Sequence, residues 1–119
     1  MDGKISIEIL EGYRDSFNKQ EGRKYPCSNQ IVVCGVFTED RNKAIEFMKD
    51  KDVVDKRERR DEIIWRLSNG EKWMWRHWNE YFRGYRFYKV AVDRDIDAKL
   101  FEYIILPYTS FYCCSFEII

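Results

Sequence analysis

The chain has 119 residues with 21 basic and 21 acidic side chains, so its formal net charge is zero, and 45% of its residues are hydrophobic. This length is typical of a single domain, residues 1–119, and the apolar content excludes a disordered or fibrous protein. No apolar run approaches the roughly 20 residues that cross a bilayer, and the polar start, residues 1–4, has no signal-peptide character, so we expect a cytoplasmic protein without a membrane partner.

The first third of the chain contains two predicted strands separated by a loop. Residues 4–10 alternate polar and apolar side chains, which predicts a half-buried strand at a sheet edge. Residues 11–30 have mixed charge and few aliphatic side chains, so we expect a loop-like segment. Residues 30–37 form an apolar, largely β-branched run, which predicts a strand buried on both faces and a buried thiol at Cys34.

A helix and a charged connector are predicted next. Thr38 is placed to cap a helix over residues 39–50, whose apolar side chains form one stripe. Residues 51–62 are almost entirely charged, which indicates a solvated connector. The alternative is a basic contact, which the interspersed acids weaken; it would use Lys56, Arg57, Arg59 and Arg60.

An Asn-Gly pair at residues 69–70, between two apolar runs, predicts a β-hairpin with a two-residue turn. That turn would pair Arg66 with Trp73 and Glu62 with His77. Arg66 over Trp73 would be a cation–π contact worth about 0.5–1 kcal/mol at an exposed site.

The last third predicts a strand over residues 86–92, a helix capped by Asp95 or Asp97 and ended by Pro107, and a final strand over residues 110–119. The element order favours an α/β (or α+β) fold. We expect a single mixed β-sheet of about five to six strands, including the hairpin, with two helices packed on it.

Basic and aromatic side chains are interleaved in residues 71–89, which carry five basic groups, two acids and eight aromatic rings. Such a segment suits three roles: packing in the core, a protein interface, or stacking on bases with guanidinium groups on phosphate. The sequence leaves these three open. The candidate ligand- or partner-binding residues are Trp73, Trp75, Arg76, Arg83, Tyr85 and Arg86.

No catalytic or metal-binding set is predicted. The single histidine, His77, lies among tryptophans, and the four cysteines lack zinc-ligand spacing. Asp93, Asp95 and Asp97 could hold Mg²⁺, but acids in this position more often end a strand and cap a helix. We therefore expect no cofactor, no metal and no catalytic residues.

Residues 28–119 resemble a reduced version of the RecA-like ATPase core of phage terminase large subunits. The resemblance lies in the strand and helix at residues 31–47, the hairpin around residues 68–70, the stretch at residues 83–86, and the apolar strand ending at Asp93. Two departures follow. The chain has no G-x-x-x-x-G-K-[ST] phosphate loop, and Arg94 stands where that family has a second acid, so we expect no ATP hydrolysis.

These observations predict a small, non-catalytic binding protein of phage type in the host cytoplasm. A counter-defence protein is the most concrete form: it would sequester a nucleotide signal or inhibit a host immune effector. In the nucleotide version, Arg83 and Arg86 contact phosphate, while Tyr85, Trp73 or Trp75 stacks on a base. The alternative is a vestigial DNA-packaging or DNA-transaction protein with weak nucleic-acid binding, against which the neutral net charge argues.

Overall fold

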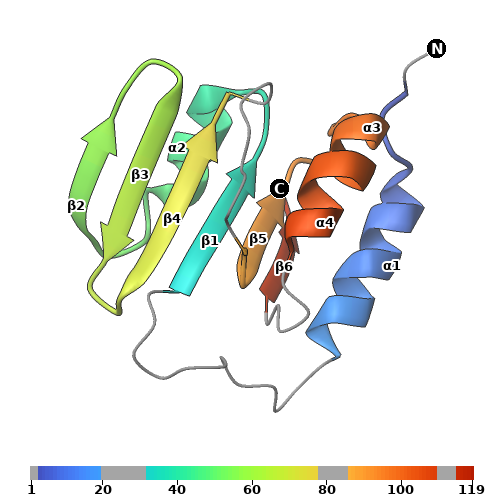
Figure 1. The fold of residues 1–119 in the computed structure, drawn as a ribbon, viewed down its shortest axis with the longest axis horizontal. Helices are drawn as coiled ribbons and strands as arrows, with labels where there is room; N and C mark the ends of the chain where they lie inside the picture. Colours follow the sequence, from blue (N-terminus) through green and yellow to red (C-terminus); the bar gives the residue numbers. More distant parts are fainter. Residues whose placement is uncertain (1–2, 20–31, 78–85, 110–114) are drawn as a thin grey trace.

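The computed structural model describes residues 3–19, 32–77, 86–109 and 115–119, which form one mixed six-stranded sheet with helices on both faces (Figure 1). This confirms the predicted fold class. The elements in chain order are α1 (Ile7–Asn18), β1 (Val32–Phe37), α2 (Arg41–Met48), β2 (Val53–Glu58), β3 (Glu62–Leu67), β4 (Glu71–Arg76), β5 (Lys89–Val92), α3 (Ala98–Leu100), the π-helical turn η1 (Phe101–Ile105), α4 (Leu106–Tyr108) and β6 (Ser115–Ile118).

The sheet has a parallel half and an antiparallel half, in the order β2-β3-β4-β1-β5-β6. Strand β1 lies at the centre and runs parallel to both β4 and β5, and β5 runs parallel to β6. Strands β3 and β2 continue the sheet beyond β4 in antiparallel order. The carboxyl ends of the four parallel strands therefore lie along one edge of the sheet.

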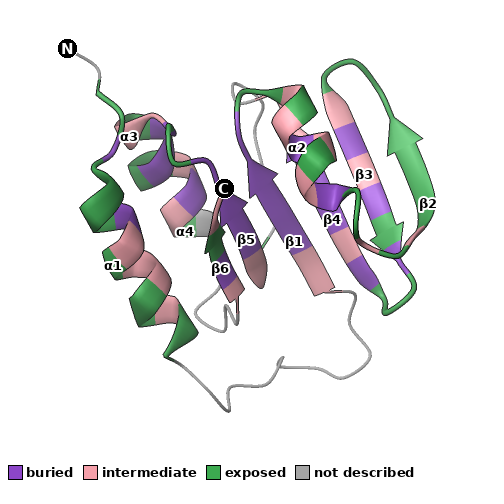
Figure 2. Ribbon diagram, turned by 180° about the vertical axis from the view of Figure 1, so that it is seen from behind, coloured by how far each residue is buried: buried purple, intermediate pink, exposed green. Residues whose placement is uncertain are grey.

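Two apolar clusters lie on opposite faces of this sheet. Helix α2 covers one face, where it packs on β1, β3 and β4 (Figure 2). Helix α1 and the helical segment α3–η1–α4 cover the other face next to β5 and β6 (Figure 1). None of the described helices covers this second face over β2 and β3 (Figure 1).

The amino-terminal element differs from the sequence prediction. The strand predicted for residues 4–10 is wrong: α1 begins at Ile7, and the Ser6 hydroxyl caps it by accepting a hydrogen bond from the Glu8 amide at 3.3 Å. Leu10 is fully buried, and Tyr13 and Phe17 pack on the same cluster, which is the helical spacing of a core stripe. Part of the predicted loop-like segment 11–30 is therefore helical, and residues 20–30 lie outside the described residues.

The charged connector predicted for residues 51–62 contains an edge strand, β2. Its residues Asp55 to Glu58 pair with β3, and most of its side chains are exposed. Charged side chains are common on edge strands because they prevent pairing with another chain. The sequence prediction missed β2 because hardly any apolar alternation marks such a strand.

The hairpin between β3 and β4 has a three-residue turn, which shifts the predicted pairing by one residue. Gly70 has φ of 92° and its amide donates to the Leu67 carbonyl at 3.1 Å. This is the geometry of a turn that ends in a left-handed glycine. Arg66 therefore pairs with Lys72 rather than Trp73, so the predicted cation–π contact is wrong.

One of the two predicted helix caps is confirmed and the other is wrong. Asp97 caps α3 as predicted, since its carboxylate accepts from the Leu100 amide at 3.0 Å. Helix α2 is capped by Asp40 instead of Thr38, and Asp40 accepts from the Asn42 amide at 2.9 Å. Pro107 lies inside the last helical turn, α4, rather than stopping the helix before it. Residues 110–114 of the predicted final strand lie outside the described residues.

Candidate functional site

Trp73 and Trp75 are core residues. Their exposed fractions are 1% and 2%, and they lie beneath α2. The indole N–H of Trp73 donates to a carboxylate oxygen of Glu71 at 3.0 Å, and that of Trp75 donates to the Thr38 carbonyl at 2.8 Å. The prediction that either ring stacks on a ligand is therefore wrong, and the core interpretation holds for both.

The three arginines predicted to bind a ligand or partner lie in different parts of the chain. Arg76 is half-buried at the carboxyl end of β4, where its Nε lies 2.5 Å from a carboxylate oxygen of Glu62. The predicted Glu62–His77 pairing is therefore wrong, because Glu62 pairs with Arg76. Arg86 is exposed and donates to the Pro107 carbonyl at 3.2 Å. Arg83 and Tyr85 lie outside the described residues.

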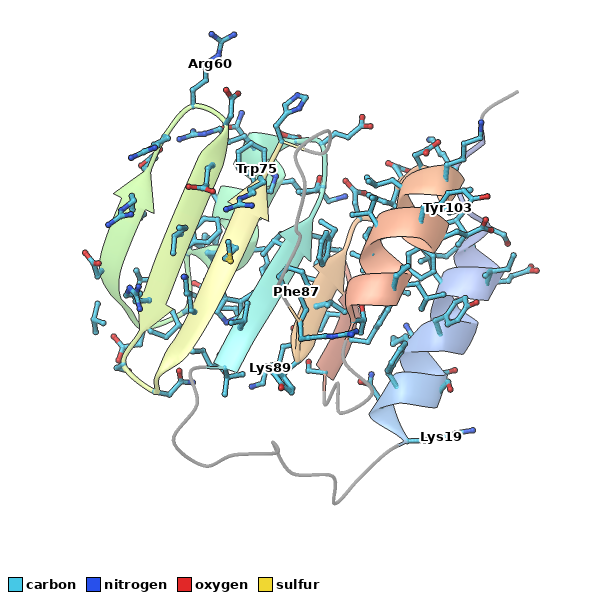
Figure 3. The ribbon with its side chains drawn as sticks, in the orientation of Figure 1. Lys19, Arg60, Trp75, Phe87, Lys89 and Tyr103 are labelled. Atoms are coloured by element: carbon cyan, nitrogen blue, oxygen red, sulfur yellow. The ribbon has the colours of Figure 1, made fainter. Side chains whose placement is uncertain are left out.

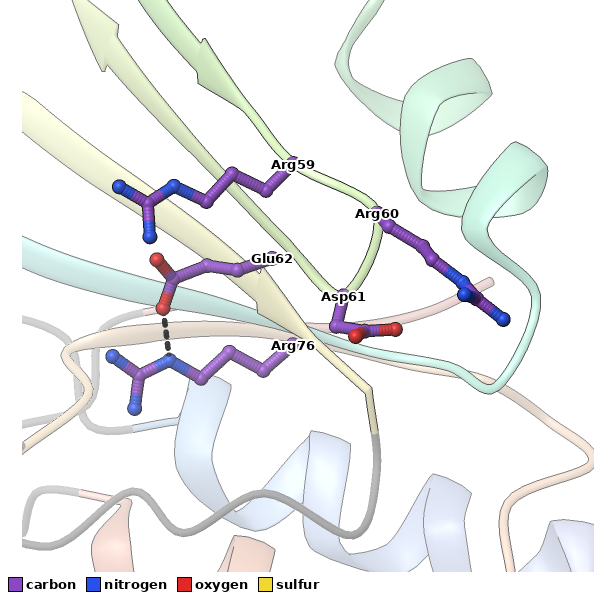
Figure 4. A pocket seen from close by; sticks show the side chains of 5 residues that line it. All are labelled: Arg59, Arg60, Asp61, Glu62 and Arg76. Carbon is purple, nitrogen blue, oxygen red and sulfur yellow. Dashed lines mark hydrogen bonds and ion pairs between the residues drawn. The ribbon is translucent and has the colours of Figure 1, made fainter.

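A hollow of about 460 Å³ lies where β2 turns into β3 (Figure 4). Arg59, Glu62 and Arg76 extend side by side on one side of this turn, and Arg60 and Asp61 point to the other. The backbone holds the turn closed, since the Arg59 amide donates to the Glu62 carbonyl at 2.7 Å. The hollow therefore has a fixed frame that presents three guanidinium groups and two carboxylates.

The positive charge of this hollow continues over the face of β2 and β3 that no described helix covers. On β3, Ile63, Trp65 and Leu67 belong to the cluster under α2, so the alternate residue Arg66 faces the other way. Arg57 lies two positions from Asp55, the partner of Arg66 on β2, and therefore shares this face. We call the group of these cations the basic patch: Arg57, Arg59, Arg66 and Lys72 lie on this face, and Arg60 lies at its border, on the β2–β3 turn.

The cations of the basic patch form no ion pair with a described residue. Among the described residues, seven lysine and arginine side chains make no ion pair, hydrogen bond or ring contact, and five of them form this patch. The other two, Lys19 and Lys99, belong to α1 and α3. The exposed acids Asp55 and Asp61 reduce the local charge to +3, although the whole chain is neutral.

Two of these cations break a rule of strand pairing. Arg66 and Lys72 lie directly opposite each other on β3 and β4. Like charges in directly opposite positions destabilise a sheet by roughly 0.2–1 kcal/mol relative to a neutral pair. Asp55 lies opposite Arg66 on its other side and offsets part of this repulsion, and positions that break a local rule are often functional.

A second polar cluster lies where β1 and β5 end. The buried carboxylate of Asp93 accepts hydrogen bonds from the Thr38 hydroxyl at 2.6 Å, from Lys43 Nζ at 2.8 Å and from the Asp95 amide at 2.9 Å. Burial alone would raise the pKa of Asp93, but these hydrogen bonds outweigh it and hold that pKa below its usual value. The charge of Asp93 is thus satisfied within the fold.

The three aspartates considered for Mg²⁺ make other contacts: two hold the backbone and one forms an ion pair. Asp93 accepts from the Asp95 amide, Asp97 caps α3, and Asp95 forms an exposed ion pair with Lys4 at 3.2 Å. Within residues 3–19, 32–77, 86–109 and 115–119, no three His, Cys, Asp or Glu side chains are placed to hold a metal ion. Cys34, the thiol predicted to be buried, is fully buried in β1.

No family model, no curated protein and no solved structure matches this chain. The resemblance to the terminase core therefore stays a prediction. Of the helices in the described segments, none has the length and apolar character of a membrane span.

The basic patch is only partly visible in the sequence. The charged run offers Arg57, Arg59 and Arg60 as an alternative contact, but it also offers Lys56, which pairs with Glu58 at 3.2 Å. Nothing in the sequence assigns Arg66 and Lys72 to this patch, because the expected two-residue turn places Arg66 opposite a tryptophan. The correct three-residue turn would have placed both cations on one face.

Proposed function

We propose that this protein is a non-catalytic binding protein that holds an anionic partner at the basic patch. The observation that carries this proposal is the gathering of four cations that form no ion pair, Arg57, Arg59, Arg66 and Lys72, on one face of the sheet, with a fifth, Arg60, at its border. A bound anion would supply counter-charge beyond that of the neighbouring acids Asp55 and Asp61.

The magnitude of the repulsion explains why the free protein tolerates this arrangement. Two unit charges about 7 Å apart in water repel each other by roughly 0.6 kcal/mol, and salt weakens this further. Such a cost is small beside the roughly 5–15 kcal/mol that stabilises a domain. A partner that neutralises several of these cations at once gains from all of them, and arginine adds paired N–H donors that match phosphate or carboxylate.

The counter-defence role remains our proposal for the biological setting, with the host cytoplasm as the place of action. In the nucleotide version, phosphate groups occupy the hollow, where Arg59, Arg60 and Arg76 take the phosphate-contacting role that was predicted for Arg83 and Arg86. In the effector version, an acidic surface of a host protein lies on the same patch.

Lys72→Glu tests the proposal, because a binding role and a structural role predict opposite results. The substitution creates an opposite-charge pair with Arg66, which should raise the free energy of unfolding by roughly 0.2–1 kcal/mol. It also reverses one charge of the patch, so it should weaken anion binding. Lys99→Glu makes the same charge change at an exposed, unpaired site on α3 and serves as the control.

Binding is measured as a thermal shift with mono-, di- and cyclic nucleotides, tripolyphosphate and poly-glutamate. A ligand at about 100 times its dissociation constant adds roughly 2.7 kcal/mol to the stability. We expect at least one of these anions to stabilise the wild type and the Lys99→Glu variant, but not Lys72→Glu. The absence of a shift with every anion, or equal shifts in both variants, would overturn the proposed function.

A further inference from the structure

We infer that the anionic partner is the sugar–phosphate backbone of a nucleic-acid duplex, lying across the basic patch with the β2–β3 turn at its border. This inference rests on the proposed function and names the partner of the same surface.

The patch is an extended, ordered array rather than a single pocket. Arg66 and Lys72 are cross-strand neighbours, Arg57 lies two residues along β2 from the partner of Arg66, and Arg59 follows beside Glu62. Neighbouring strands are about 4.8 Å apart, and same-face residues on one strand are about 6.8 Å apart. The cations thus spread over a surface that matches a repeating polyanion better than a small ligand, which would fill only the hollow.

The composition of the patch favours nucleic acid over an acidic protein. Protein interfaces centre on buried aromatic and aliphatic anchors. Among the described residues near the cations, the apolar side chains that reach the surface are the aliphatic Ile64, which is half-buried, and Val54, which is exposed; Met74 is fully buried. Protein–nucleic-acid interfaces are more polar and more positively charged, and arginine matches the geometry of phosphate oxygens.

A duplex fits the described face better than a single strand. Proteins that bind single strands usually stack the exposed bases on aromatic rings. The tryptophans of β4, Trp73 and Trp75, are buried on the opposite face of the sheet. A duplex keeps its bases stacked internally and offers its backbone to cations without any need for a ring.

Arg60 gives the surface a projecting cation. It extends beyond the edge of the sheet from the β2–β3 turn, away from the body of the protein (Figure 3). Arginines that project in this way can enter the minor groove, where the negative potential is strongest at narrow sites. The turn therefore anchors one border of the contact, and the sheet face provides the remaining cations.

The test measures the affinity of the full chain for a fluorescein-labelled 20-base-pair DNA duplex by anisotropy, between 50 and 200 mM NaCl. If the five cations each displace one counterion, log K falls with log[salt] at a slope of about −4.5, which is roughly a 500-fold loss over this range. Arg66→Ala should reduce the size of that slope by about 1, whereas Lys19→Ala should leave it unchanged. Two duplexes of unrelated sequence should bind within about threefold of each other, because backbone contacts carry no sequence information.

Thermal melting of each variant checks that the exposed substitutions leave the fold intact. Three results would overturn the inference: no duplex binding at 50 mM NaCl, equal slopes for Arg66→Ala and Lys19→Ala, or tighter binding of a single strand of the same length. Stabilisation by poly-glutamate or a nucleotide without duplex binding would overturn the inference but leave the proposed function standing. Failure of every anion would remove both.

Discussion

The polar cluster at the ends of β1 and β5 makes a prediction about stability. Asp93→Asn keeps the shape of the side chain but removes the charge that accepts from the Thr38 hydroxyl, Lys43 and the Asp95 amide. A hydrogen bond to a charged group contributes about 1.5–3 kcal/mol, and a buried donor left without an acceptor costs about 1–3 kcal/mol.

Solvent exposure reduces the contribution of the hydrogen bond from Lys43, but it does not reduce the cost of leaving the Thr38 hydroxyl without an acceptor. Lys43 is 32% exposed and can regain water, whereas Thr38 is 2% exposed and cannot. We therefore expect Asp93→Asn to lower the free energy of unfolding by about 2 kcal/mol, which lowers Tm by roughly 6–10 °C in a chain of this size. Urea denaturation followed by circular dichroism gives the free energy directly.

A double-mutant cycle isolates the ion pair within this cluster. Lys43→Ala should cost about 1 kcal/mol in the wild type and close to nothing in the Asp93→Asn background, since the partner charge is already gone. If the two substitutions are additive, the pair contributes nothing and the argument from charge is wrong.

The pH dependence follows from the lowered pKa of Asp93. A carboxyl whose pKa is lower in the folded state contributes stability above its unfolded value, here the usual 3.8, and loses it as the pH falls through the folded pKa. The difference in stability between wild type and Asp93→Asn should therefore stay constant above about pH 5 and shrink below about pH 4. A difference that grows on acidification would refute this reasoning.

Four further substitutions concern three glycines and the hollow. A Cβ at Gly35 would lie 2.7 and 2.9 Å from the rings of two buried phenylalanines, so Gly35→Ala should destabilise the fold by about 1–3 kcal/mol. Gly12→Ala, in the open interior of α1, should instead stabilise it by about 0.5–1 kcal/mol; equal urea midpoints for these two variants would contradict the packing described. Gly70→Ala should cost about 1 kcal/mol because of its positive φ, and an unchanged Tm would exclude the three-residue turn. Glu62→Gln removes the acid paired with Arg76, so duplex affinity at 50 mM NaCl should rise; weaker binding would mean that Glu62 positions Arg76 for the ligand.

The sequence predicted the buried centre of the fold better than its edges. The central strand around Cys34 is marked by a β-branched apolar run, and the Asp97 cap by an acid before an apolar stripe, so both follow from local pattern. The amino-terminal segment failed because its apolar spacing fits a strand over seven residues and a helix over twelve. Only the burial of Leu10 in the tertiary structure decides between them.

The candidate site was harder to predict because it depends on register. A turn longer by one residue moves Arg66 from the tryptophans to Lys72, and with it the positive charge moves to an open face. Net charge was also misleading, since a neutral chain can segregate paired and unpaired cations on different surfaces. Aromatic side chains such as Trp73 occur both in protein cores and at interfaces, and the sequence alone cannot distinguish these two roles.

The most direct test of the binding account is a map of amide chemical shifts in the ¹⁵N-labelled protein as tripolyphosphate is added. The account predicts saturable shifts at Arg57, Arg59, Arg60, Arg66 and Lys72, with little change at Lys19 and Lys99. Shifts confined to Thr38, Lys43 and Asp93, or to α1, would contradict it.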